Sequence, residues 1–506
     1  MKSLIKIAMI ACLALMLMAC NTENETDFTS PMVIYTLPTN GESNVSVDTT
    51  ITIAFNEEIN PYTVTSSSFT LTRVGAFSKV INSTVSSLGN LATLTPDVPL
   101  EPNTTFVATI TSYVTDNNGN GIPLGYMMSF TTGALTNSIA SFTSAIMVTG
   151  QSDFTNGASN MGGTPTQYSM SAPAGAPYVY NATGSLLLPD TGNNRILGYS
   201  YFPSYNGYPA DFVFGQYDYI SNSPMADYWG LSSPRGFHMD EANGWSAVTD
   251  TGNNRIMIWA GLPSAAAFPY VLLGQADYYG TVAYCDQSHL NQPSSAIVVN
   301  GKVIVADTGN NRVLIWDSVP STSGYGSYIV LGQSSFDTCA AGAPNAATLN
   351  APTSVWSDGN ILIVADTGNN RVLLWTAFPT YSAEPATIVI GQPNVYTSVP
   401  YTSSVNLNGP TAVTSDGKKL IVADTGNNRV LIWNSLPDMS NESADVVLGQ
   451  ASFLTGAPND DNNDSVQDAN PSARTLFAPS GMTTYYGYLL VGDTGNNRYL
   501  TYYLGR

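Results

Sequence analysis

Six copies of the hexapeptide Asp-Thr-Gly-Asn-Asn-Arg carry the most regular charged side chains of the chain, and each copy places a carboxylate five residues before a guanidinium. Such a pair can bind a polar ligand, or it can close a salt bridge within the protein. A ligand of ordinary size cannot contact six equivalent sites alike, so we predict that the pairs are structural and that each Arg meets an Asp of the same or a neighbouring repeat. The pairs are Asp190 and Arg195, Asp250 and Arg255, Asp307 and Arg312, Asp366 and Arg371, Asp424 and Arg429, and Asp493 and Arg498.

An acidic stretch between the last two copies has the spacing of a calcium-binding loop. Its oxygen-bearing residues are Asp460, Asn462, Asp464 and Asp468. They would occupy the first, third, fifth and ninth positions of such a loop, where alternate residues turn hard oxygen ligands inward. However, Ser465 stands in place of the sharp-turn Gly, and Pro471 stands where a bidentate acid would close the site. The sequence leaves two interpretations open, a calcium site and a solvated acidic loop.

Arg235 and His238 make the second repeat different from the others. At the position of Arg235 the other repeats have Ala174, Ser294, Thr353, Thr411 and Ser480, and at that of His238 they have Pro177, Ile297, Trp356, Thr414 and Thr483. We expect function where the repeats disagree, and predict that Arg235, with His238 nearby, contacts a ligand at the mouth of a central channel. A lone strand histidine can also be a packed, hydrogen-bonded residue, and that alternative stays open.

Aromatic residues are concentrated in two of the connections between repeats. One connection holds Tyr217, Tyr219, Tyr228 and Trp229, and the next holds Tyr278, Tyr279 and Tyr284. Aromatic platforms on a rim suit the stacking of carbohydrate or peptide ligands, so Trp229 and Tyr279 are candidate ligand contacts. The same side chains could instead pack inward beneath the loops.

Two cysteines, Cys285 and Cys339, lie in adjacent connections, ten residues after Gln275 and six after Gln333. After export they could form a disulfide between neighbouring repeats. Sequence spacing does not decide between this bond and two free thiols.

These residues must be positioned by a unit of four short strands. Each unit opens after a Pro, runs its second strand into the hexapeptide, places a Trp or Tyr four residues beyond the Arg, and ends its fourth strand near a Gly-Gln pair. Six such antiparallel units predict an all-β fold with a six-bladed β-propeller over residues 142–506. The sequence closely resembles the NHL repeat family across all six units.

The phase of the repeat predicts how the propeller closes. The first Gly-Gln pair, at Gly150, precedes every copy of the hexapeptide, and the last unit stops after its third strand. Residues 142–150 should therefore supply the outer strand of the last blade, which removes two unpaired strand edges.

Residues 31–133 have short β-branched runs separated by turn residues, a pattern that predicts a β-sandwich of about seven strands. The segments Pro38-Thr39-Asn40-Gly41, Ile53-Ala54-Phe55-Asn56-Glu57 and Ser129-Phe130-Thr131-Thr132 resemble a bacterial Ig-like domain of the surface-layer type. The resemblance implies a spacer or adhesion module. A short linker, residues 134–141, joins it to the repeats.

The start of the chain predicts export. Residues 1–19 combine a basic end with an apolar run too short to span a membrane. Leu17-Met18-Ala19-Cys20 resembles the bacterial lipobox, which implies lipidation of Cys20, although an ordinary signal peptide with a chance Cys is the alternative. Residues 20–30 are polar and suit a flexible tether. We therefore expect a lipid-anchored protein of the bacterial cell envelope, in the outer membrane if the host is Gram-negative.

The charge balance excludes one class of partner. The formal net charge is −20, and a surface with few free cations cannot neutralise a nucleic-acid backbone. The leading hypothesis is a monomeric binding or scaffold protein that presents its loops to a protein or glycan, with calcium as the one cofactor to consider. The alternative is a metal-dependent lyase or lactone or ester hydrolase, as in some similar propellers. His238 and His289 do not occupy matching positions, so they cannot assemble a multi-histidine zinc site.

Overall fold

A computed structural model describes residues 28–47, 49–74, 79–97, 100–101, 104–133, 139–181, 183–263 and 268–505. The chain divides into two compact units at residues 137 and 138. The predicted signal peptide, the predicted lipidation site at Cys20 and most of the predicted tether lie outside the described residues. Regular structure in the described part consists of β-strands and short 3₁₀ helices. None of its helices is long and apolar enough to cross a membrane.

The first unit is a sandwich of two β-sheets. One sheet has the order β1-β3-β7-β6 and the other the order β2-β9-β8-β4-β5. The strands are β1 (Val33–Leu37), β2 (Glu42–Val45), β3 (Ile51–Phe55), β4 (Phe69–Arg73), β5 (Lys79–Ile81), β6 (Ser83–Leu88), β7 (Leu91–Pro96), β8 (Thr105–Ile110) and β9 (Tyr126–Thr132), with a short helix η1 (Pro61–Thr63). Along β8 every second residue is buried, as expected for a strand with one face against a core.

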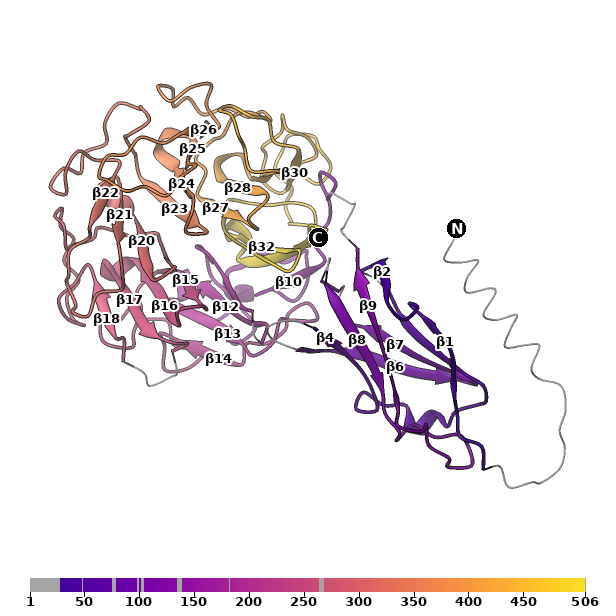
Figure 1. Cartoon of the computed structure of the whole chain (residues 1–506). Coiled ribbons are helices and arrows are strands. Elements are labelled where there is room, and N and C mark those ends of the chain that lie inside the picture. The colour runs from indigo at the N-terminus through magenta and orange to yellow at the C-terminus, as the bar shows by residue number, and fades with distance from the viewer. Residues whose placement is uncertain are drawn as a thin grey trace. The chain divides into compact units, whose positions relative to one another are not determined.

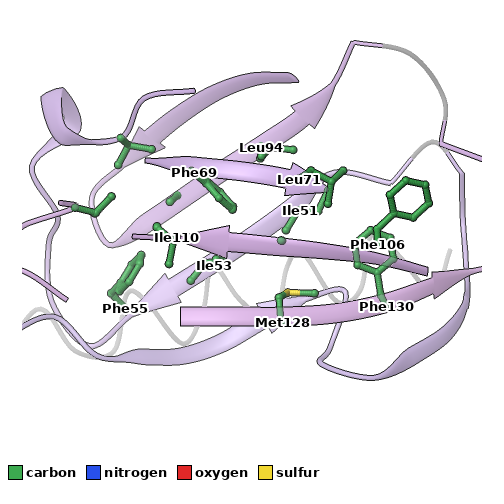
Figure 2. Close-up of a cluster of buried hydrophobic side chains, with 14 of the residues drawn as sticks. Ile51, Ile53, Phe55, Phe69, Leu71, Leu94, Phe106, Ile110, Met128 and Phe130 are labelled. Carbon is green, nitrogen blue, oxygen red and sulfur yellow. The ribbon is translucent and has the colours of Figure 1, made fainter. Parts of the chain in front are cut away.

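Apolar side chains from both sheets fill the space between them. Figure 2 shows Phe55, Phe69 and Leu71 within this core, and all three are almost completely buried. The rings of Phe106 and Phe130 stack with their centroids 5.8 Å apart. Burial of these side chains stabilises the sandwich through the hydrophobic effect.

The second unit consists of six four-stranded antiparallel sheets that follow one another along the chain as the blades of a β-propeller (Figure 1). Blade 1 contains β11 (Tyr178–Tyr180), β12 (Ser185–Asp190), β13 (Arg195–Tyr199) and β14 (Phe212–Phe214); blade 2 contains β15 (Pro234–Asp240), β16 (Trp245–Asp250), β17 (Arg255–Ala260) and β18 (Val271–Leu273). Blade 3 contains β19 (Ser295–Val299), β20 (Lys302–Asp307), β21 (Arg312–Trp316) and β22 (Ile329–Leu331); blade 4 contains β23 (Pro352–Ser357), β24 (Leu362–Asp366), β25 (Arg371–Trp375) and β26 (Ile388–Ile390). Blade 5 contains β27 (Ala412–Ser415), β28 (Leu420–Asp424), β29 (Arg429–Trp433) and β30 (Val446–Leu448); blade 6 contains β31 (Pro479–Tyr485), β32 (Tyr488–Asp493), β33 (Arg498–Tyr503) and β10 (Met147–Thr149). A further 3₁₀ helix, η2 (Ser159–Gly162), precedes blade 1.

The first strands of neighbouring blades contact one another, so they surround the centre of the ring. The second strands are buried along almost their whole length because each blade is packed between two others. In β24, for example, every residue from Leu362 to Asp366 is buried. This explains why these strands read as continuous Val, Ile and Leu runs rather than as an alternating pattern.

The propeller closes with a strand from the beginning of the domain. β10 pairs antiparallel with β33, with Met147 opposite Thr501 and Thr149 opposite Tyr499. Blade 6 is therefore built from both ends of the domain and leaves no unpaired edge at that junction. The predicted fold class, a β-sandwich followed by a propeller closed in this way, is confirmed.

Each hexapeptide forms a short 3₁₀ turn between the second and third strands of its blade. The turns are η3 (Thr191–Asn193), η4 (Thr251–Asn253), η5 (Thr308–Asn310), η6 (Thr367–Asn369), η7 (Thr425–Asn427) and η8 (Thr494–Asn496). The second Asn of the motif takes the left-handed conformation, with φ of 53° at Asn370. The Gly serves a different purpose, because a Cβ on Gly368 would lie 2.5 Å from Cγ of Asn350. Only glycine lets the turn approach the preceding connection this closely.

Candidate functional site

Each Asp and Arg of the hexapeptide form a buried ion pair within their own blade. In blade 4, Arg371 Nε donates to Asp366 Oδ2 at 2.7 Å, and both side chains are completely buried. The terminal nitrogens of Arg371 donate to the carbonyls of Val395, Asn345 and Thr348 in the flanking connections. The same Arg–Asp contact occurs in every blade, at 2.6 to 2.7 Å. Since a ligand cannot reach these groups, their contacts place them in the scaffold.

The motif also joins each blade to the next. The Thr hydroxyl donates to the carbonyl of the Pro that opens the following blade, as from Thr367 to Pro410 at 2.7 Å. The sixth bond runs from Thr494 back to Pro173 at 2.6 Å and completes the ring. The six donors are Thr191, Thr251, Thr308, Thr367, Thr425 and Thr494. These contacts are almost the same in all six blades. A candidate site must therefore be sought where the blades differ.

Arg235 is the exception among the described arginines. The other eight each form an ion pair with an acidic residue. Arg235 has no ion pair, and its side chain has no hydrogen bond, within the described part of the chain. It lies where the register of β15 against β16 shifts between Pro234 and Gly236. A bulge of this kind turns a side chain out of the regular alternation of a strand.

The Arg235 guanidinium is partly exposed, and burial lowers its pKa. Arginine nevertheless remains protonated in proteins. The start of β15 therefore holds a partly desolvated positive charge without a counter-ion from the described residues. The predicted role of Arg235 as a ligand contact stays a prediction, and this environment is favourable for it.

His238 is packed and hydrogen-bonded. Its Nδ1 accepts from the backbone N–H of Val298 at 3.3 Å, and its ring lies 5.7 Å from that of Tyr178, measured between centroids. Burial lowers the pKa of His238 to about 4, and nearby Asp240 opposes this shift. The ring is consequently neutral at pH 7, with its proton on Nε2. This geometry matches the alternative that the sequence left open, a histidine that serves packing.

The two candidate aromatic contacts have different environments. Trp229 is 8% exposed, and its ring lies 4.4 Å from Phe214 between centroids. The prediction that Trp229 contacts a ligand at the surface is therefore wrong, because the indole packs between blades 1 and 2 as part of their shared core. Tyr279 is 73% exposed and remains available.

Tyr279 belongs to a set of exposed apolar residues that the sequence analysis did not recognise. Counting four residues beyond the Gln that ends a blade gives Ile220, Tyr279, Tyr396 and Leu454 in four of the six connections. Each is at least 66% exposed. Their equivalent positions can be seen in the sequence, but only when each connection is numbered from the Gln that precedes it.

The acidic loop does not gather its carboxylates around one point. Asp460 is buried and accepts from the backbone N–H groups of Asp464 and Ser465 at 3.0 and 2.9 Å. Asp468 likewise accepts from the N–H of Asp461 and from the side chain of Asn462. In the described residues there is no group of three or more His, Cys, Asp or Glu placed to hold a metal ion. The predicted calcium site is therefore not formed in this structure, because its carboxylates do not converge.

Cys285 and Cys339 are joined by a disulfide, with their Cα atoms 6.3 Å apart. The bond links the connections that follow blades 2 and 3. Arg312 of blade 3 also holds both connections, because it donates to the carbonyls of Asp286 and Phe336. The disulfide therefore reinforces a junction that the ion-paired arginine already organises.

A pocket of about 380 Å³ lies in the loop between the third and fourth strands of blade 3. Its lining includes Trp316, Asp317, Tyr325 and Tyr328. The two tyrosines are 61% and 66% exposed, whereas Asp317 is paired with Lys302 at 2.8 Å. Because successive strands alternate in direction, this loop lies on the face of the propeller opposite the hexapeptides. The pocket was not expected from the sequence, because the candidate residues lie in the connections between blades and this loop lies within one blade.

Comparison with known proteins supports the description of the first unit. Residues 27–132 match the family model of the bacterial Ig-like domain. With the two-sheet sandwich, this match shows that the chain has a bacterial Ig-like domain at its N-terminal end. No curated protein matches the chain at a significant level.

Several solved structures are similar to this chain at low sequence identity. An auxiliary nutrient binding protein from Bacteroides ovatus is 11% identical, with a TM-score of 0.43, over 95% of this chain and 99% of that one. A gluconolactonase from Xanthomonas campestris is 12% identical, with a TM-score of 0.37, over 73% of this chain and 99% of that one. Virginiamycin B lyase from Staphylococcus aureus is 13% identical, with a TM-score of 0.33, over 65% of this chain and 94% of that one. Similarity at this level carries no functional assignment.

Proposed function

We propose that this protein is an exported, lipid-anchored binding or scaffold protein whose NHL-type propeller, residues 142–506, presents one face to a protein or glycan. We call this the motif face. It carries the hexapeptide turns and the connections between blades, which are joined by hydrogen bonds such as that from Asn370 Nδ2 to the carbonyl of Ser398.

The observation that carries the proposal is a set of exposed apolar side chains on the motif face, at a position where the six connections differ. Ile220, Tyr279, Tyr396 and Leu454 occupy equivalent positions in four connections and are mostly exposed. Exposed apolar surface rimmed by polar residues is a feature of interaction sites. Tyrosine adds a planar ring and a hydroxyl, which suit both sugars and polypeptides.

The N-terminal segments fit this role as an anchor and a spacer. Lipidation of Cys20 would attach the protein to a membrane, with residues 20–30 as the tether and residues 31–133 as the Ig-like spacer. This arrangement belongs to the bacterial cell envelope, and to the outer membrane in a Gram-negative host. Retention of a lipid label by the wild-type protein, and its loss on Cys20→Ser, would support the anchor.

The binding role can be tested with two matched pairs of exposed tyrosines. Tyr279→Ser with Tyr396→Ser removes apolar surface from the motif face. Tyr325→Ser with Tyr328→Ser removes a similar surface from the opposite face and serves as the control. The full-length proteins would be compared on a glycan array and against purified envelope proteins.

We expect the motif-face variant to lose at least about tenfold in affinity for any ligand found, because two apolar contacts of about 1 kcal/mol each are removed. The control should bind like the wild type. Equal losses in both variants, or no ligand for the wild type, would contradict the proposal. Turnover of a lactone that is lost on His238→Ala would point instead to the enzyme alternative.

A further inference from the structure

The residues that directly follow the opening prolines form a ring at the starts of the six first strands. We call it the axial ring; it consists of Ala174, Arg235, Ser294, Thr353, Thr411 and Ser480. Backbone contacts connect its members between blades. Gly175 N donates to the carbonyl of Ser480 at 3.2 Å, and Ala176 N donates to the carbonyl of Arg235 at 3.1 Å. The residues from blades 6, 1 and 2 are therefore neighbours at the centre of the motif face.

Four members of the axial ring have hydroxyls that bond to the Thr of the hexapeptide. The pairs are Ser294 with Thr308, Thr353 with Thr367, Thr411 with Thr425, and Ser480 with Thr494. In blade 2 that Thr is Thr251, which donates to the carbonyl of Pro293. Arg235 thus takes the place of a scaffold hydroxyl without taking over its side-chain bond.

Blade 1 has no hydroxyl at its position in the axial ring. Its ring member is Ala174, and the following residue is Gly175, with φ of +88°. A Cβ on Gly175 would lie 1.5 Å from the carbonyl oxygen of Arg235, so only glycine backbone fits there. The described residues of blade 1 supply no acidic partner to Arg235 that could neutralise its charge.

A partly buried charge without a partner is unfavourable, and in folded proteins such a charge is normally paired. Every other described arginine of this chain follows that rule. We propose that Arg235 binds the carboxylate of an acidic sugar at the centre of the motif face. This inference rests on the proposed binding function and names its ligand class.

Three considerations select this ligand. The planar fork of an arginine matches a carboxylate with two parallel hydrogen bonds. The net charge of −20 repels polyanions, so a ligand with a single negative charge is favoured. The exposed Tyr279 and Tyr396 of the same face favour a sugar as the carrier, because an aromatic ring stacks on the C–H face of a sugar while its hydroxyl bonds to sugar hydroxyls.

The test is calorimetric titration of the full-length protein with glucuronic acid and with glucose, which lacks the carboxylate. Arg235→Thr is the informative variant because blades 4 and 5 already fold with Thr at this position. Arg235→Lys keeps the charge but loses the planar fork. Arg474→Ala is the control for loss of a cation, since Arg474 is paired with Asp461 and 42% exposed.

We expect glucuronic acid to bind the wild type and Arg474→Ala equally, and to bind Arg235→Thr about 10- to 100-fold more weakly, as for loss of a charged hydrogen-bonded pair. Arg235→Lys should be intermediate. Without ligand, Arg235→Thr should melt at the same temperature as the wild type or higher, since an unpaired charge is removed. A melting temperature lower by several degrees would reveal a structural role and overturn the inference.

The other outcomes separate this inference from the proposed function. Binding of glucose as tightly as glucuronic acid, or binding that survives Arg235→Thr, would overturn the carboxylate site while leaving a sugar-binding protein. An acetylated tripeptide with a free carboxylate that binds through Arg235, when its amide and glucuronic acid do not, would overturn the sugar and assign a peptide terminus. A motif-face ligand that ignores Arg235 altogether would refute this inference alone.

Discussion

Replacing Arg371 by Met tests whether the buried ion pairs hold the blades together. The substitution keeps most of the side-chain volume but removes four hydrogen bonds, to Asp366 and to the carbonyls of Asn345, Thr348 and Val395. Asp366 then remains completely buried with only the N–H of Asn350 and the amide of Asn369 as donors.

The expected cost follows from the burial of the pair. Burial raises the pKa of the Asp366 carboxyl, and the Arg371 guanidinium opposes that shift, so loss of the cation leaves an uncompensated buried acid. Removing one partner of a buried pair costs about 3–5 kcal/mol. Three backbone carbonyls also lose their hydrogen-bond donor, and this favours the upper end of that range. For a domain of this size, we expect the melting temperature to fall by roughly 4–7 °C.

The assay is scanning calorimetry of the propeller transition, with Lys302→Met as the matched control. Lys302 forms its ion pair with Asp317 at the surface, where the side chains are 31% and 51% exposed. Such a pair contributes about 0–1 kcal/mol, so the control should melt within about 2 °C of the wild type. If Arg371→Met cost less than about 1 kcal/mol, or no more than the control, the interpretation that the buried ion pairs hold the blades together would be refuted.

Three further predictions concern other parts of the propeller. Gly175→Ala should destabilise by more than about 3 kcal/mol because its Cβ would overlap the carbonyl of Arg235, whereas Gly301→Ala, with φ of +77° but open space, should cost about 1–2 kcal/mol; urea titration compares them. Reduction of the Cys285–Cys339 bond, which spans 54 residues, should lower stability by less than about 4 kcal/mol, and Cys285→Ser with Cys339→Ser should abolish the effect of reductant on the melting temperature. His238 has a folded-state pKa of about 4, below its ordinary value, so the unfolded chain takes up its proton first and stability falls as pH drops from about 6.5 towards 4. His238→Gln should remove about 1–3 kcal/mol of that acid sensitivity, and a pH series of melting temperatures that is identical for both proteins would contradict the assignment.

The sequence was most informative where a pattern repeats. The hexapeptide, the opening Pro and the Gly-Gln pair mark the same three points of every blade, so an error in one unit is corrected by the other five. The closing strand was predicted in the same way, from the Gly-Gln pair that precedes the first copy, and β10 occupies that place. Without such repetition the prediction was less complete. The sandwich has nine strands in its described residues, whereas about seven were expected.

Individual sites were predicted less well because burial depends on what surrounds a residue. Trp229 is an aromatic residue in a connection between blades, which suggested a ligand contact at the surface. However, the rings of Phe214 and Trp259 form an apolar site that encloses it. Asp460 has the spacing of a calcium ligand, but it accepts from backbone N–H groups four and five residues away, and the loop does not bring its carboxylates together. The spacing of residues along the sequence shows which contacts are possible, but it does not show which of them is the most favourable in the folded protein.

The sequence by itself determined the number of blades, their strand order and the residues that the blades share, because periodic apolar runs and turn residues act locally along the chain. Only the tertiary structure decided which Asp each Arg binds, that Cys285 meets Cys339, and that Arg235, alone of the described arginines, has no counter-ion among the described residues. The disulfide joins segments 54 residues apart, and each Arg had an Asp of its own repeat and of the neighbouring repeats as possible partners. The energies of these contacts depend on distance and desolvation, which exist only once the ring has closed.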